Sequence, residues 1–209
     1  MSSSFKGNLF IVSAPSGAGK TSLLKALSER MSSFEIAIST TTRNQRPGET
    51  DGVHYYFVDR SKFESLIEAD QFLEYAEVFG NYYGTSRSTV EKVLEKGVDL
   101  VLEIDWQGAQ QVRAKNPDCT SIFILPPSKD ELRNRLTGRG QDPMEVIDKR
   151  MAAALEEISH YNEYDYLVIN DVFAEALDEL QQIIESNRLT LSYQENKHAE
   201  MLAQLKRDE

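Results

Sequence analysis

The feature that most constrains the fold is the glycine-rich segment Ala14–Thr21, which lies between a short apolar run and a helical pattern. Its sequence, APSGAGKT, differs by one residue from the phosphate-loop pattern G-x-x-x-x-G-K-[ST], because Ala14 stands where the pattern has its first glycine. Alanine is tolerated there if the position keeps a negative φ. The alternative is a chance glycine-rich turn, which explains neither the strand before the segment nor the helix after it. The segment therefore predicts a loop that binds the phosphates of a nucleotide.

The chemistry of such a loop follows from its backbone. Glycine residues let consecutive N–H groups point at phosphate oxygens, and the start of the following helix adds a positive dipole. The Lys20 ammonium reaches the β- and γ-phosphates, and the Thr21 hydroxyl is a ligand for Mg²⁺. The residues predicted to bind ATP in this loop are Ala14, Pro15, Ser16, Gly17, Ala18, Gly19, Lys20 and Thr21.

Strands and helices alternate along most of the chain. The apolar run Leu9–Val12 predicts a buried strand, and Thr21–Met31 has the apolar spacing of a helix. Alternation of this kind predicts an α/β fold, a P-loop NTPase-type parallel sheet flanked by helices. Further strands are expected at 34–39, 100–104, 120–125 and 166–169, and further helices at 85–96, 107–115, 128–137, 144–161 and twice after 170.

Residues from about 40 to 85 differ from the rest and predict an inserted mixed α/β subdomain. They begin with the polar segment TTRNQRPGETDG, which is rich in residues that break regular structure. Strands are expected at Val53–Val58 and Phe72–Val78, with a short helix between them that starts at a Ser61–Glu64 capping box. The prediction is a single domain over 1–209, with a core at about 5–39, 86–137 and 162–209.

The charge of the chain limits its partners. A net charge of −11 argues against a protein that coats a nucleic acid polymer or lies on an anionic membrane. The lone Cys119 suits a reducing compartment, where buried packing is the expected role for it. No apolar stretch approaches the roughly 18 residues of a membrane span, and the first residues lack a signal-peptide core. The expected location is the cytoplasm.

A second group of residues predicts a separate phosphate site. Arg43 and Arg46 lie three apart in the segment STTTRNQRPGE and can converge on one phosphate, whose oxygens match the fork of a guanidinium group. Tyr55 and Tyr83 can add neutral hydrogen-bond donors to the same oxygens. Taken alone, the segment favours a solvated surface loop.

A GTPase is the first rival interpretation. The residues Asp105–Gly108, DWQG, match the D-x-x-G motif with which GTPases sense the γ-phosphate. No N-K-x-D motif for reading guanine follows them in the chain. A GTPase would then need another way to recognise its base, which disfavours this interpretation.

Over nearly its whole length the chain resembles the guanylate kinases, most closely the bacterial form. The similar segments occur in the family's order and include the alanine that opens the loop. They are SAPSGAGKT, STTTRNQRPGE, GNYYGTS at 80–86, EIDWQG at 103–108, ILPPS at 124–128, RLTGRG at 135–140 and VIND at 168–171. The resemblance implies ATP-dependent phosphorylation of GMP, and of dGMP, to the diphosphate in purine metabolism.

The resemblance also implies an acceptor site inside the insert. Guanine presents N–H donors along one edge, so a carboxylate pairs with them, whereas the corresponding adenine nitrogen is an acceptor that a carboxylate disfavours. The residues implied to recognise guanine are Glu74, Thr85 and Asp105. The alternative for Glu74 is an exposed strand residue, and the alternative for Asp105 is a cap at the end of a strand. The residues implied to hold the GMP phosphate are Ser39, Arg43, Arg46, Tyr55 and Tyr83.

On the donor side the resemblance implies three arginines and a strand end. A lid over about 138–161 would close on ATP, with a hinge at GRGQDP. Arg135, Arg139 and Arg150 would clamp the phosphates and the transferred group together with Lys20 and Arg43, although spacing alone favours a solvated basic face. Asn170 and Asp171 would contact the adenine side, or Asp171 would cap the following helix. Glu103 replaces an aspartate found in many relatives near the Mg²⁺, which leaves its metal role open.

Three further points concern mechanism and assembly. The GMP phosphate is largely ionised at neutral pH, so no general base is required, and His54, His160 and His198 form no triad. A scaffold module that has lost catalysis is the rival from another class, but such a module need not keep Lys20 or the arginines. The segment after Thr190 fits either a homo-oligomer contact or an isolated solvated helix.

Overall fold

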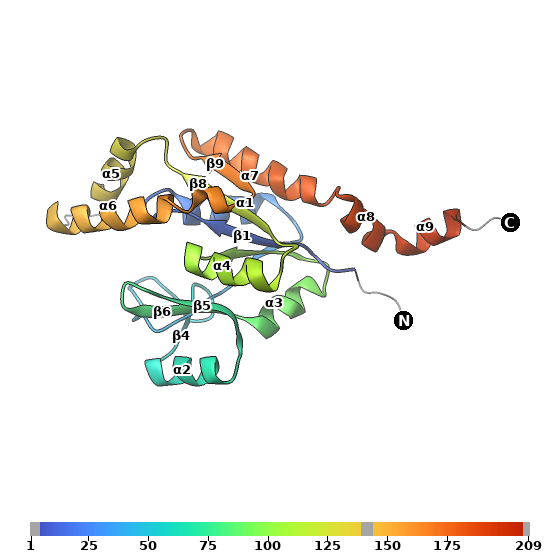
Figure 1. The fold of residues 1–209 in the computed structure, drawn as a ribbon, viewed down its shortest axis with the longest axis horizontal. Coiled ribbons are helices and arrows are strands. Elements are labelled where there is room, and N and C mark those ends of the chain that lie inside the picture. Colours follow the sequence, from blue (N-terminus) through green and yellow to red (C-terminus); the bar gives the residue numbers. More distant parts are fainter. Residues whose placement is uncertain (1–4, 139–143, 207–209) are drawn as a thin grey trace.

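The computed structural model describes residues 5–138 and 144–206 of the chain. Within these ranges a five-stranded sheet forms the centre of the molecule (Figure 1), and all its neighbouring strands are parallel, as the sequence predicted. The strand order places the first strand in the middle. In that order the strands are β2 (Phe34–Ile36), β7 (Asp99–Glu103), β1 (Leu9–Ser13), β8 (Thr120–Leu125) and β9 (Tyr166–Ile169).

Helices cover both faces of this sheet. Strand β1 shows the division, because Phe10 and Val12 pack with the first face and Leu9 and Ile11 with the second. Since both faces of the central strands are covered, all five residues of β1 are buried, and β7 is buried from Asp99 to Leu102. The helices of the first face are α1 (Lys20–Arg30) and α7 (Phe173–Asn187), and those of the second are α3 (Arg87–Leu94) and α4 (Trp106–Lys115).

The insert forms a sheet of its own, which lies below the main sheet in Figure 1. Strands β3 and β4 pair in parallel, and the other pairs are antiparallel. Phe63 on the accompanying helix stacks between Phe72 and Tyr82, with ring centroids 4.5 and 5.2 Å away. The elements, in sheet order, are β4 (Tyr56–Phe57), β3 (Thr40–Thr41), β6 (Asn81–Ser86) and β5 (Phe72–Val78), with α2 (Arg60–Glu68).

Helix α4 of the main body is joined to β5, the edge strand of this second sheet. The Gln111 side chain donates to the Tyr75 carbonyl (2.6 Å) and accepts from the Tyr75 N–H (3.2 Å). The Lys115 ammonium donates to the carbonyl of Leu73 at 2.6 Å. These contacts satisfy backbone groups of the strand edge that would otherwise need water or another strand.

Two local predictions for the insert were wrong. The predicted strand Val53–Val58 is reduced to the two residues of β4, because the chain turns at Gly52, where φ is +74°, and leaves Val53 63% exposed. Ser61 does not start α2: the N-cap is Asp59, whose carboxylate accepts from the Lys62 N–H at 2.7 Å. An aspartate before the first turn is as good a cap as serine.

Beyond the main sheet, α5 (Lys129–Thr137) and α6 (Met144–Ile158) pack on each other through a small apolar cluster. The predicted cap Ser128 is confirmed, since its hydroxyl accepts from the Glu131 N–H at 3.1 Å. Most of the predicted hinge lies in 139–143, outside the described residues.

The C-terminal part contains three helices where two were expected: α7, α8 (Leu191–Lys197) and α9 (Ala199–Leu205). Helices α8 and α9 extend away from the body in Figure 1. Across 5–138 and 144–206, the structure contains no helix with both the length and the apolar character needed to cross a bilayer.

Candidate functional site

The predicted phosphate loop follows β1 directly, at the edge where the carboxyl ends of the parallel strands meet. Gly17 and Gly19 have φ of +97° and +94°, a region that L side chains rarely adopt. A Cβ at Gly19 would also lie 2.4 Å from the Asn170 side-chain nitrogen. Ala14 has no positive φ, so an alanine fits at the first position of the loop.

Asn170 braces the loop from the end of β9. Its side-chain amide is buried and donates to the Ala18 carbonyl at 2.7 Å, while its own carbonyl accepts from Arg135 at 3.0 Å. Arg135 is further held by Glu131, 2.8 Å away. The structure therefore brings together three predicted site segments, namely the loop, Arg135 and Asn170. The Asn170 side chain, which was predicted to contact the adenine side, is bonded to the loop instead. Beside them lies a cavity of about 430 Å³ lined by Gly17, Gly19, Ser22, Arg135, Gly138, Asn170, Asp171 and Phe173.

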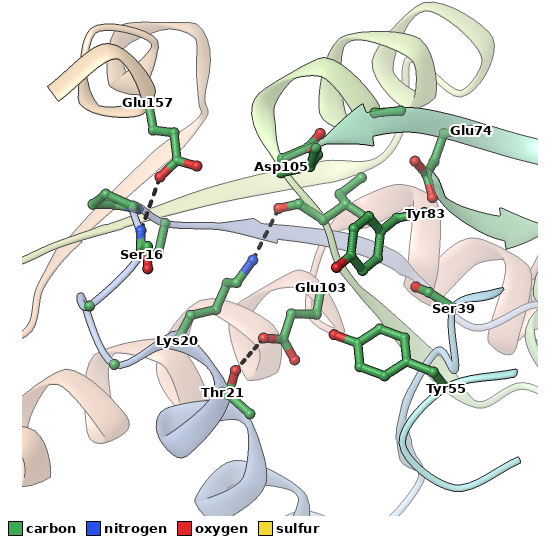
Figure 2. Close-up of a pocket in the computed structure, with 17 residues that line it drawn as sticks. Ser16, Lys20, Thr21, Ser39, Tyr55, Glu74, Tyr83, Glu103, Asp105 and Glu157 are labelled. Atoms are coloured by element: carbon green, nitrogen blue, oxygen red, sulfur yellow. Dashed lines mark hydrogen bonds between the residues drawn. The ribbon is translucent and has the colours of Figure 1, made fainter. Parts of the chain in front are cut away.

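The two polar residues that close the loop contact the end of β7 (Figure 2). The Lys20 ammonium donates to the carbonyl of Ile104 at 3.2 Å. The Thr21 hydroxyl donates to the Glu103 carboxylate at 2.6 Å. A hydroxyl and a carboxylate oxygen side by side are the ligand type that Mg²⁺ prefers, so this pair fits the predicted metal position.

Glu157 is a site residue that the sequence analysis missed. It lies near the end of α6, and its carboxylate accepts from the Ser16 N–H of the loop at 3.0 Å (Figure 2). Burial raises its pKa, although the Ser16 N–H and the nearby Lys20 partly offset the effect. No local pattern marks it, because its partner lies 141 residues away.

A central cavity of about 260 Å³ runs from the loop to the insert. Figure 2 shows that side chains from the loop, the end of β7, β5, β6 and α6 surround it. This arrangement brings residues predicted for the donor and the acceptor nucleotide to one space. The polar members are Ser16, Lys20, Thr21, Ser39, Tyr55, Glu74, Tyr83, Glu103, Asp105 and Glu157.

Glu74 is the most buried acid of this cavity, with 3% of its surface exposed. Burial raises its pKa to about 7, and hydrogen bonding from Thr85, which faces it on β6, opposes the shift. Its Oε1 atom has no hydrogen-bond partner among the described residues. Gly108 leaves room for the other oxygen, since a Cβ there would lie 2.6 Å from it. An exposed strand residue, the alternative for Glu74, is excluded.

Asp105 has the capping role that the sequence analysis gave as the alternative to binding guanine. It is the N-cap of α4, and its Oδ1 atom accepts from the Gly108 N–H at 2.9 Å. It also lines the central cavity, so capping fixes the carboxylate at the cavity wall. Its reading of a base stays a prediction.

Arg43 and Arg46 both donate hydrogen bonds to one carboxylate, that of Glu49. Glu49 receives two hydrogen bonds from the Arg43 guanidinium, at 2.7 and 3.1 Å, and one from the Arg46 N–H at 2.7 Å. This pairing lowers the pKa of Glu49 to about 2 and raises that of Arg43. Both arginines line a second cavity of about 650 Å³ together with Ser39, Tyr55 and Tyr83. The five predicted phosphate contacts therefore border one space.

The two remaining predicted arginines are Arg139 and Arg150. Arg139 lies outside the described residues. Arg150 lies on α6, seven residues before Glu157 and thus two helical turns from it. The third predicted guanine contact, Thr85, is buried beside Ser39, with the two hydroxyl oxygens 3.5 Å apart.

Known proteins are similar to this chain in sequence and in fold. A family model described as guanylate kinase matches residues 6–187. A guanylate kinase of Haemophilus influenzae is 59% identical over 203 residues, which cover 96% of this chain and 98% of the relative. That of Escherichia coli K12 is 56% identical over 205 residues, 97% and 99% of the two chains. The crystal structure of the Anaplasma phagocytophilum guanylate kinase superposes with a TM-score of 0.75 at 35% identity, covering 89% and 88% of the chains.

Proposed function

Because the chain belongs to the guanylate kinase family and phosphorylates GMP to GDP with ATP, we propose that its phosphate loop holds ATP and its insert holds GMP. The carrying observation is the buried Glu74, whose Oε1 atom has no partner among the residues described. A polar atom buried in this way needs a hydrogen bond, and the donor edge of guanine supplies one. Asp105 and Thr85 complete the proposed guanine pocket.

The proposed phosphate pocket of GMP is the space shared by the arginines and tyrosines of the insert. Ser39, Tyr55 and Tyr83 supply hydroxyl donors there. Arg43 and Arg46 supply charge, and Glu49 is the partner of the Arg43 guanidinium until the phosphate binds. A dianionic phosphate is the stronger acceptor of charge-assisted hydrogen bonds, which supports an exchange of partners.

On the donor side we assign the loop amides, Lys20 and Arg135 to the ATP phosphates. Asn170, Asp171 and Phe173 line the cavity beside the loop, which supports a place for the adenosine part there. Arg139 and Arg150 are proposed to reach the transferred group from the lid over about 138–161. Clustered guanidinium groups stabilise the negative charge on the phosphoryl group in the transition state of its transfer.

We propose Thr21 and Glu103 as the residues that hold Mg²⁺. Their oxygens lie 2.6 Å apart, and both are hard ligands. A magnesium ion at the loop would neutralise part of the charge on the phosphates. The site's own residues then align the reactants: the GMP phosphate needs no deprotonation at neutral pH, so Lys20 and the arginines act by position and charge.

The proposal extends to the acceptor range and the setting. Nothing in the contacts proposed for GMP involves the ribose 2′-hydroxyl, which supports dGMP as a second acceptor. The free cysteine Cys119 and the nucleotide substrates support a place in cytoplasmic purine metabolism.

A Glu74→Gln variant tests the acceptor pocket. The amide brings a donor to face the donors of guanine, so we expect the KM for GMP to rise at least about tenfold, or ~1.4 kcal/mol, while the KM for ATP stays within twofold. Steady-state rates from a coupled ADP assay measure both constants. The matched control is Glu77→Gln on the same strand, where the side chain is exposed. Equal effects of Glu74→Gln on both substrates would contradict the placement.

A further inference from the structure

Glu157 presents an acidic group to a loop whose main-chain N–H groups serve to bind phosphate. Its Oε2 atom accepts from the Ser16 N–H at 3.0 Å, and the carboxyl group lines the same cavity as Lys20 and Asp105 (Figure 2). A carboxylate oxygen and a phosphate oxygen are the same kind of acceptor for a backbone N–H. Glu157 therefore occupies one of the positions that an anionic ligand of this loop would use.

The charges around Glu157 make this contact sensitive to a second anion. Lys20 attracts the carboxylate, whereas Asp105 and the neighbouring Glu156 repel it. A triphosphate bound at the loop adds several negative charges close to the Glu157 carboxylate. It also competes with that carboxylate for the Lys20 ammonium. Like charges within a few ångströms repel strongly in a partly buried site, so the Glu157 contact and bound phosphates oppose each other.

We propose that Glu157 is a positioning residue whose carboxylate occupies the Ser16 amide until the phosphates of ATP displace it, so that ATP binding releases α6 from the loop. This inference rests on the proposed binding of ATP at the loop. Helix α6 also carries Arg150, two turns before Glu157 on the same side of the helix. The contact thereby ties the position of a proposed phosphate-clamping arginine to the occupancy of the loop.

Calorimetric titration of the full-length protein with a non-hydrolysable ATP analogue and Mg²⁺ tests the competition. Because Glu157→Ala removes the competing carboxylate, the analogue should bind at least about fivefold tighter than to the wild type. Glu157→Gln keeps an acceptor for Ser16 but no charge, and should fall between the two. Adenosine, which has no phosphate, should bind all three proteins equally. Unchanged or weaker binding of the analogue to Glu157→Ala would overturn the proposal.

Glu156→Gln is the matched control, because it removes the same charge from the preceding residue, which is exposed. It should change the affinity for the analogue by less than twofold. If Glu156→Gln changed the affinity as much as Glu157→Gln does, the result would reflect the net charge of the region, and the proposed competition at the Ser16 N–H would be overturned. Lys20→Ala tests the premise separately: if it leaves analogue binding unchanged, the placement of ATP at the loop fails, whatever Glu157 does.

A measurement on the wild type keeps the proposal testable if a variant does not fold. Amide exchange should find the Ser16 N–H protected in the free protein, and carbon-13 NMR of the Glu157 carboxyl should shift when the analogue is added. In Glu157→Ala the Ser16 N–H should exchange faster without nucleotide and regain protection with it. A Glu157 carboxyl signal that does not respond to saturating analogue would overturn the displacement.

Discussion

Glu74 combines deep burial with a titration near neutrality, and both properties come from its position on β5. Its pKa of about 7 lies above the ordinary value of 4.5, chiefly because burial disfavours the charged form. Between these two pH values the folded protein holds a proton that the unfolded chain has lost. The free energy of unfolding therefore falls as pH rises from about 4.5 to about 7.

This linkage predicts a pH-dependent difference between the wild type and Glu74→Gln. From pH 5 to 7 the wild type should lose stability relative to the variant by up to about 1.4 kcal/mol per pH unit, and the difference should level off above pH 7.5. Urea denaturation of the nucleotide-free proteins at several pH values measures it. The other acids with shifted pKa values, Glu157 included, are present in both proteins, so their contributions to the pH dependence cancel in the difference. A difference that does not vary with pH would show that Glu74 titrates normally.

Asn170 acts on the loop through one buried hydrogen bond, to the Ala18 carbonyl. Replacing it with alanine leaves that carbonyl without its donor, at a cost of about 1–3 kcal/mol. We expect Asn170→Ala to lower the melting temperature and to raise the KM for ATP several-fold, with the KM for GMP nearly unchanged. Asn170→Asp keeps the size of the side chain but lacks the N–H donor, so it should be at least as damaging. Wild-type kinetic constants in Asn170→Asp would contradict a role of this hydrogen bond in holding the loop.

Among the elements, the cap of α2 gives a direct comparison of two neighbouring residues. Asp59→Ala removes the side chain that accepts from the Lys62 N–H and should destabilise the insert by about 1 kcal/mol. Ser61→Ala changes the second residue of the helix and should stay within about 0.5 kcal/mol. Amide exchange across α2, or urea denaturation, distinguishes the variants. A larger effect at Ser61 would restore the capping box that the sequence predicted.

The strands that the sequence predicts well are those buried on both faces. Leu100–Ile104 and Thr120–Leu125 are mainly apolar segments, and the structure has β7 and β8 within one residue of these bounds. Strands β3 and β6 could not be recognised in this way. Thr40–Thr41 is too short for a pattern, and NYYGTS is largely polar, so both depend on the partner strands of the second sheet.

The candidate site divides along the same line. The position of the loop and its need for glycine could be predicted, because the glycines and Lys20 lie within one motif. The Glu157 contact and the inward turn of the Asn170 side chain could not, since their partners lie 141 and 152 residues away. Resemblance to a family identifies which residues recur together, but it gives neither the burial of Glu74 nor the atom that each side chain faces.

At the scale of the whole molecule, the second sheet and the pair α5–α6 lie on different sides of the loop edge (Figure 1). The central cavity touches both, through Glu74 and Glu157. Simultaneous binding of GMP and a non-hydrolysable ATP analogue should draw the second sheet toward the main sheet, exclude water from the transferred group and reduce the radius of gyration. Small-angle scattering with each ligand alone and with both measures this, and an unchanged radius with both ligands would count against closure.

The link between α4 and β5 bears on how this enzyme could be given a different acceptor. The chain enters and leaves the second sheet near Thr40 and Ser86, which invites its replacement by the equivalent segment of a kinase for another monophosphate. Gln111 and Lys115, however, are bound to the strand that carries Glu74. A transplanted segment would thus arrive without its anchoring helix, and its base-reading strand would lose the contacts that hold it against the main body. A successful graft would have to bring α4 along with it.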